Sequence, residues 1–228
     1  MKTTPYDDAG ILARIKNAYP GENVVHTQSY LRLEAALATQ TNINFNVLQN
    51  VGNANVTERR LAITDVFTIT GISMMIYKAG AAAAATQAEI AVSVLRTWPN
   101  AQVFTGVGEA SNLMAFYNSF LTIKVDSRVY LNAMDLMRFY RVGTSQQNVG
   151  SSAVSNVAVQ RDEFTETNYG FAKMAPTISL SGAGNNEISV QLPSSINLAG
   201  TSSQNFAVCY LRGILSQNAS KLNPGAGI

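Results

Sequence analysis

The first forty residues have apolar positions at the spacing of amphipathic helices. A first helix is predicted ahead of Pro20-Gly21, with an apolar face made of Ile11, Leu12, Ile15 and Tyr19. Asp7 or Asp8 can cap its start. A second helix is predicted over 27–39, where Tyr30, Leu33 and Leu37 share one face. We therefore expect a helical N-terminal arm over residues 1–40, packed on its own domain or on a neighbouring copy.

From residue 41 the spacing of apolar positions changes to two, which is the period of a strand. Ile43, Phe45 and Val47 alternate with asparagines, as in a strand with one buried face. A longer β-rich run covers 61–78, and Gly71 inside it indicates a bulge or a bend.

The second half of the chain contains further strand patterns. Two hairpins are predicted, one over 121–131 and one over 177–192, because each joins two β-rich runs through a short turn. A final strand is predicted over 206–215, and the polar residues 216–228 form an extended tail.

The segments between the strands are irregular. The alanine-rich stretch 80–95 fits a helix by its propensity and a surface loop by its position between strands. Residues 109–120 have the apolar spacing of a short helix. The polar stretch 143–159 is predicted to be a long loop or an exchanged arm.

These elements predict a mainly β protein. At least seven strands without βαβ alternation favour a β-sandwich, and the long connections and helical arm favour a jelly-roll-like one. The predicted organisation is a helical arm over 1–40, one sandwich domain over 41–215 and a tail over 216–228.

The composition of the chain includes few of the side chains that usually carry out catalysis. Only 13% of the residues are charged, against about 25% in an ordinary soluble domain, and neutral polar residues replace them. The net charge of +2 falls short of what a dedicated nucleic-acid binder carries. The N-terminus lacks the apolar core of a signal peptide, and no apolar run is long enough to span a membrane. Such a surface favours contact with other protein surfaces.

Candidate catalytic groups are few. His26 is the only histidine and Cys209 the only cysteine, and we expect a surface or capping role for the first and burial for the second. Glycoside hydrolysis and calcium binding both use clustered carboxylates, and the chain offers one such cluster, which we expect to form a solvated turn: Asp162, Glu163 and Glu166. Gly106-Val107-Gly108 is predicted to be a simple turn. We therefore predict no catalytic residues, no metal site, no cofactor and no enzyme activity.

Candidate interface residues come from three places. The arm offers Ile11, Ile15 and Tyr19. Arg59 and Arg60 follow Glu58, and we expect them to make protein–protein salt bridges rather than nucleic-acid contacts. Trp98 lies in a predicted loop, where a rigid ring can pack, anchor an interface or stack on a sugar.

Several segments resemble those of virion structural proteins of bacteriophages that infect Bacteroidetes. The segments are 45–50, 57–61, 96–100 with Phe104, 116–118 and 176–182. The resemblance implies a capsid or other particle protein, made in the host cytoplasm, that contacts copies of itself and other virion proteins. It implies no catalytic residues.

The leading hypothesis is therefore a bacteriophage capsid protein that self-assembles into the virion shell. Lys2, Arg14 and Lys16 on the arm would give a weak contact with the genome. The alternative is a glycan-binding β-sandwich module of a fibre or decoration protein, with stacking surfaces from Trp98, Tyr130, Tyr140 and Tyr169. A hydrolase that uses the acidic turn is a third hypothesis.

Overall fold

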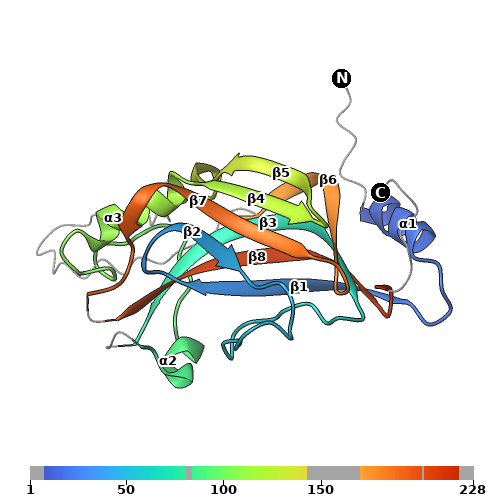
Figure 1. The fold of residues 1–228 in the computed structure, drawn as a ribbon, viewed down its shortest axis with the longest axis horizontal. Helices are drawn as coiled ribbons and strands as arrows, with labels where there is room; N and C mark the ends of the chain where they lie inside the picture. Colours follow the sequence, from blue (N-terminus) through green and yellow to red (C-terminus); the bar gives the residue numbers. More distant parts are fainter. Residues whose placement is uncertain (1–7, 81–83, 143–169, 202, 221–228) are drawn as a thin grey trace, which may run out of the picture.

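The computed structural model describes residues 8–80, 84–142, 170–201 and 203–220 of the chain (Figure 1). The strands are β1 (Val25–Ala36), β2 (Thr39–Phe45), β3 (Val66–Ala79), β4 (Phe120–Val125), β5 (Arg128–Asp135), β6 (Ala172–Ser181), β7 (Asn186–Asn197) and β8 (Gln204–Gln217). The helices are α1 (Asp8–Ala18), α2 (Gln87–Ala91), α3 (Glu109–Tyr117) and a 3-10 turn, η1 (Leu136–Phe139). The chain is therefore mainly β, as predicted.

The strands form two antiparallel sheets of four strands each (Figure 1). Sheet A has the order β1-β8-β3-β6, and sheet B has the order β2-β7-β4-β5. The pairs β1·β8, β2·β7, β3·β6 and β4·β5 are nested in the sequence, so the chain resembles one long hairpin rolled into two layers. Eight strands paired in this way form a jelly roll. The predicted jelly-roll β-sandwich is confirmed.

Of the two predicted hairpins, the one over 121–131 is confirmed and the one over 177–192 is wrong. β4 and β5 pair across a two-residue turn in which Asp126 and Ser127 both have positive φ, as tight hairpin turns require. β6 and β7 follow each other closely, but β6 pairs with β3 whereas β7 pairs with β2 and β4. The connection between β6 and β7 therefore crosses from sheet A to sheet B, and the two strands face the same core from opposite sheets.

The helix predicted over 27–39 is also wrong, because this segment forms β1 at one edge of sheet A. Leu31 and Leu33 are buried between the sheets while Tyr30 and Arg32 point the other way, which is a period of two. Pairing with β8 is unbroken along all 12 residues of β1, and this ladder outweighs the helical spacing of the apolar residues. The sandwich therefore begins at residue 25 rather than 41, and α1 alone is the helical part of the arm.

The remaining predictions are largely confirmed. The register of β3 shifts between Ile69 and Gly71, where the bend was expected. α3 confirms the helix over 109–120, and the alanine-rich stretch contains the short helix α2 within a longer irregular connection. β8 continues through Gln217, two residues into the predicted tail, whereas 143–159 and 221–228 lie outside the described residues.

Helices cover the two ends of the outer face of sheet A (Figure 1). α1 lies at one end and packs Ile15 and Tyr19 in an apolar cluster with Ile214 of β8. α2 lies at the other end and buries Ile90 in the cluster that contains Phe206 of β8. The middle of this face lies between the two helices and carries the residues described below.

Glu109, the first residue of α3, ties this helix to both central strands of sheet A. Its carboxylate accepts hydrogen bonds from Lys78 of β3 (2.9 Å), Asn205 of β8 (2.8 Å) and the backbone N–H of Gly106 (2.7 Å). Gly106 belongs to the turn predicted at 106–108, and Gly108 caps α3 with a positive φ. Burial raises the pKa of Glu109, but these hydrogen bonds outweigh burial and hold the pKa below its ordinary value.

We expect the stability of the fold to depend on the ionisation of Glu109. Because its pKa is lower in the folded than in the unfolded chain, its contribution is complete above its ordinary value of 4.5 and is lost as the pH falls through the folded pKa. In thermal unfolding followed by circular dichroism, Glu109→Gln should be destabilised at neutral pH, and the difference from the unsubstituted protein should shrink in acid. Glu187→Gln, which removes an exposed ion pair, is the control and should change little at either pH. A destabilisation by Glu109→Gln that does not vary with pH would contradict this account.

Candidate interaction faces

The middle of the outer face of sheet A carries a row of three aromatic rings with a guanidinium group at each end. Tyr30 of β1 stacks on Tyr210 of β8 with ring centroids 5.3 Å apart, and Phe171, which precedes β6, meets Tyr210 edge-on at 5.5 Å. The guanidinium of Arg59 lies 5.0 Å from the centre of the Tyr30 ring, and that of Arg212 lies 4.9 Å from the centre of the Phe171 ring. Cation–π contacts of this kind hold arginine side chains in place. We call these five residues the arginine-aromatic row.

The strand register brings this row together. Tyr30 is paired with Arg212, and Arg32 is paired with Tyr210, so rings and guanidinium groups alternate across β1 and β8. Arg212 then passes over Gly71 of β3, where a Cβ atom would lie only 2.8 Å from its Nε. Glycine at position 71 therefore leaves the space through which Arg212 passes.

A groove of about 510 Å³ adjoins the row, between α1 and the outer face of sheet A. Ile11 and Leu12 of α1 line one side of it, and His26, Lys173 and Arg212 line the sheet. Thr27, Gln28, Ser29 and Thr70 complete the lining. The groove thus combines an apolar wall with a floor rich in hydrogen-bond donors.

His26 lies within β1 rather than ahead of a helix. Its Nδ1 is 2.9 Å from the Oγ of Ser216 on β8. Partial burial, together with the positive charge of Lys16 on α1, lowers the pKa of its imidazole. Within the part of the chain that the structure describes, no three His, Cys, Asp or Glu side chains gather as metal ligands would. The contact with Ser216 joins β1 to its neighbouring strand.

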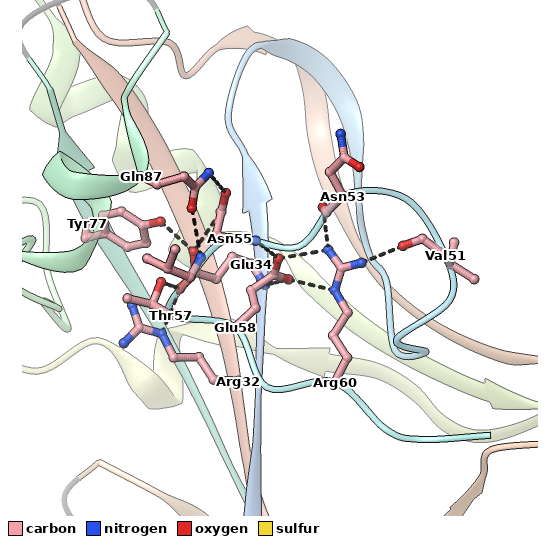
Figure 2. A network of polar contacts seen from close by, with 11 residues as sticks. Arg32, Glu34, Val51, Asn53, Asn55, Thr57, Glu58, Arg60, Tyr77 and Gln87 are labelled. Atoms are coloured by element: carbon pink, nitrogen blue, oxygen red, sulfur yellow. Dashed lines mark hydrogen bonds and ion pairs between the residues drawn. The ribbon is translucent and has the colours of Figure 1, made fainter. Parts of the chain in front are cut away.

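Beyond the row, the connection between β2 and β3 is fastened to sheet A by a buried carboxylate (Figure 2). Glu34 of β1 has a fully buried side chain and accepts hydrogen bonds from Arg32 (2.7 Å), Thr57 (2.7 Å), Asn55 (2.8 Å) and Tyr77 (2.6 Å). Burial and the neighbouring carboxylate raise the pKa of the Tyr77 hydroxyl, so this group stays a donor. Four donors surround the two oxygens of one carboxylate, which is how a buried charge is stabilised.

The same connection contains a second buried ion pair (Figure 2). Arg60 is 5% exposed, lies 2.8 Å from Glu58, and donates to the backbone carbonyls of Val51 and Asn53. Glu58 also accepts from the backbone N–H of Glu34 at 3.0 Å. Arg60 therefore makes its salt bridge inside its own chain, whereas the neighbouring Arg59 is exposed. This ordered connection holds Arg59 beside Tyr30.

The structure separates the other interface candidates. Ile15 and Tyr19 are buried against their own sandwich, so α1 takes the first of the two alternatives for the arm. Ile11 is half-buried at the groove, and Trp98 is half-buried in the connection after α2. Several candidates lie outside the described residues, namely Lys2, Asp162, Glu163, Glu166 and Tyr169.

The outer face of sheet B has a different chemistry, with mainly neutral polar groups. Asn44, Ser189 and Thr122 lie opposite one another across β2, β7 and β4. Lys124 and Glu187 on this face form an exposed ion pair at 2.9 Å, which cancels their charges. The face presents hydrogen-bonding groups with little net charge.

β5 is one of the two edge strands of sheet B, and four exposed apolar side chains lie on it, on the neighbouring β4 and on η1, which follows it. The exposed fractions are 46% for Phe120, 52% for Val129, 53% for Tyr130 and 41% for Met137. We call these four residues the β5 edge surface. An edge strand also leaves backbone N–H and C=O groups free to pair with another strand.

No known protein family matches this sequence, and no curated protein is similar enough to count as a relative. None of the helices in the described residues has the length and hydropathy needed to cross a membrane.

Sequence reasoning missed most of the arginine-aromatic row. Only Arg59 was singled out, because the helix predicted over 27–39 placed Tyr30 on the wrong kind of element. The signal was present as a period of two, with Tyr30 and Arg32 on one strand and Tyr210 and Arg212 on another. It becomes visible only when both segments are recognised as strands that pair with each other.

Removing the buried carboxylate of Glu34 should destabilise the protein. Glu34→Ala leaves four donors without an acceptor, so we expect the free energy of unfolding to fall by about 2–4 kcal/mol. Urea unfolding followed by tryptophan fluorescence and circular dichroism measures the change. Glu22→Ala, in an exposed connection, is the control and should stay within about 0.5 kcal/mol of the unsubstituted protein. Equal stability of the two variants would show that the network does not stabilise the fold.

Proposed function

We propose that this chain is a capsid structural protein of a bacteriophage, a jelly-roll subunit that assembles with copies of itself into the virion shell. It would be made in the host cytoplasm, would reside in the virion and would contact other virion proteins there. Its role is structural, without a catalytic site or cofactor.

One observation carries this proposal: a jelly roll in which apolar side chains on and beside an edge strand of sheet B are exposed. Fold alone does not decide function, because jelly rolls also occur in lectins and cupins. The β5 edge surface adds the more specific argument. Phe120, Val129, Tyr130 and Met137 are between 41% and 53% exposed, and contact with a neighbouring subunit would remove them from water.

The energetics of a shell suit such a modest surface. Complete burial of a large apolar side chain contributes about 1.5–3 kcal/mol, so four half-exposed ones contribute a few kcal/mol to one contact. Backbone pairing along the edge of β5 can add hydrogen bonds. A closed symmetric particle repeats the contact many times, so a weak single interface is sufficient.

Introducing charge at the β5 edge surface should prevent assembly. We expect the unsubstituted protein to form closed particles in negative-stain electron microscopy and fast-sedimenting species in analytical ultracentrifugation. The double variant Val129→Glu/Tyr130→Glu should remain small, because burying like charges at each contact costs several kcal/mol.

The matched control is Val107→Glu, since Val107 is fully exposed in the turn before α3. This variant should assemble normally. A protein that stays monomeric at its highest soluble concentration, or a double variant that assembles as well as Val107→Glu, would refute the proposal.

A glycan-binding module is the second candidate, and one observation favours it. A shallow cavity of about 270 Å³ at the β4–β5 turn is lined by Lys124, Asn185 and Glu187, and by Val129, which precedes the exposed ring of Tyr130. Trp98 and Tyr140 are not among its lining residues, and Tyr140 packs edge-on against Tyr117 of α3.

The glycan alternative is tested on a glycan array. It requires saturable binding that Tyr130→Ala abolishes and Val107→Ala leaves unchanged. We expect no such binding, because a single ring beside a shallow cavity offers little stacking area; a positive result would favour the alternative over the shell.

A further inference from the structure

The outer faces of the two sheets differ in charge. The face of sheet A carries Arg59, Arg212 and Lys173, and α1 beside it adds exposed Arg14 and Lys16. On the face of sheet B, Lys124 forms an ion pair with Glu187.

We propose that the outer face of sheet A binds the phosphate backbone of a single-stranded nucleic acid, from α1 through the groove to the arginine-aromatic row. The inference deepens the proposed shell function and rests on it for its biological meaning, because the nucleic acid would be the enclosed genome.

The groove contains side chains of the kind that bind phosphate. Phosphate oxygens are bound by cationic side chains and by hydroxyl, amide and backbone donors. Lys173, Arg212 and His26 line the groove together with Gln28 and Thr70, and no carboxylate is found among its described lining residues. Lys16 stands close enough to His26 to lower its pKa, which indicates a positive potential at this end of the face.

The carboxylates near the row are already neutralised. Glu34 and Glu58 are held in the buried network by Arg32 and Arg60, so neither presents a free charge to the outside (Figure 2). Arg59 adds a charge that neither of these carboxylates offsets. Neither of these two carboxylates therefore opposes a polyanion that approaches Arg59.

The arginines of the row are fixed before any ligand arrives. Arg212 lies over Phe171 in the space that Gly71 leaves. Arg59 lies over Tyr30, and its backbone exchanges two hydrogen bonds with Arg32 at 2.9 and 3.0 Å. Ordering a long side chain costs about 0.5–1.5 kcal/mol on binding, so arginines held in place bind phosphate at lower cost.

The spread of the cations favours a chain of phosphates over one small anion. They come from α1, the connection before β3, β6 and β8 rather than from one point. A flexible single strand can follow this path between α1 and the β2–β3 connection, and its unpaired bases can contact the edge of Tyr30, which is 39% exposed.

The test is fluorescence anisotropy of a labelled oligothymidylate with dilute, unassembled protein at increasing salt. We expect binding whose logarithm falls linearly with the logarithm of the salt concentration. The double variant Lys16→Gln/Arg59→Gln should bind several-fold more weakly and lower the salt slope by about 1.4, which is about 0.7 for each lost phosphate contact. Gly71→Ala should also weaken binding, with no change in net charge, because it displaces Arg212.

Arg128→Gln/Arg138→Gln is the matched control, since both side chains are exposed on the β5 side and the loss of charge is the same. It should bind as the unsubstituted protein does, and circular dichroism verifies that all variants are folded. Absence of binding at low salt, equal weakening by the two double variants, or tighter binding of a duplex of the same length would each overturn the proposal.

This test is separate from the test of the shell. A protein that assembles but does not bind the oligonucleotide refutes this inference and leaves the shell proposal intact. A protein that binds the oligonucleotide but stays monomeric refutes the shell proposal and leaves the proposed nucleic-acid binding by sheet A intact.

Discussion

The antiparallel pairing of β1 with β8 is the contact on which the outer face of sheet A depends. It joins strands from the two ends of the described chain through 12 residue pairs without a register shift. The pairing sets Tyr30 against Arg212 and Arg32 against Tyr210. It also places Glu34 where the β2–β3 connection can close over it, which holds Arg59 in the row.

The two faces of the sandwich are built differently. Sheet A is covered at both ends by helices and has a row of rings and guanidinium groups between them. Sheet B has neutral polar rows and an exposed apolar edge. In the account proposed above, each side has its own role, since the edge of sheet B meets other subunits while sheet A meets the genome.

Much of the architecture follows from the period of the apolar residues. The alternation of Ile43 and Phe45 with asparagines gave β2, and Gly71 marked the bend in β3, because local pattern decides both. β1 was mistaken for a helix because Tyr30, Leu33 and Leu37 fit a helical face, and only pairing with β8, at the other end of the described chain, fixes the period of two. The crossing between β6 and β7 was not predicted. Two strands of alternating apolar and polar residues joined by a short turn have the same sequence pattern whether they pair in one sheet or lie in two different sheets.

The predicted interface residues differ in whether the structure exposes them, because burial depends on contacts between distant segments. Arg59 and Arg60 are neighbours in sequence, yet one is exposed beside Tyr30 and the other is 5% exposed in an ion pair with Glu58. The sequence shows two adjacent arginines, but it does not show which of them the folded β2–β3 connection buries. Ile15 and Tyr19 likewise have the pattern of an interface helix, and it is their own sandwich that they cover.

The central claim is that identical subunits meet through the β5 edge and turn sheet A toward the interior. Cryo-electron microscopy of particles assembled from this chain, at a resolution that separates strands, tests it most directly. The account predicts contacts at Val129 and Tyr130 between neighbouring subunits and the arginine-aromatic row on the inner surface. Particles whose outer surface displays that row, or whose subunit contacts avoid β5, would contradict it.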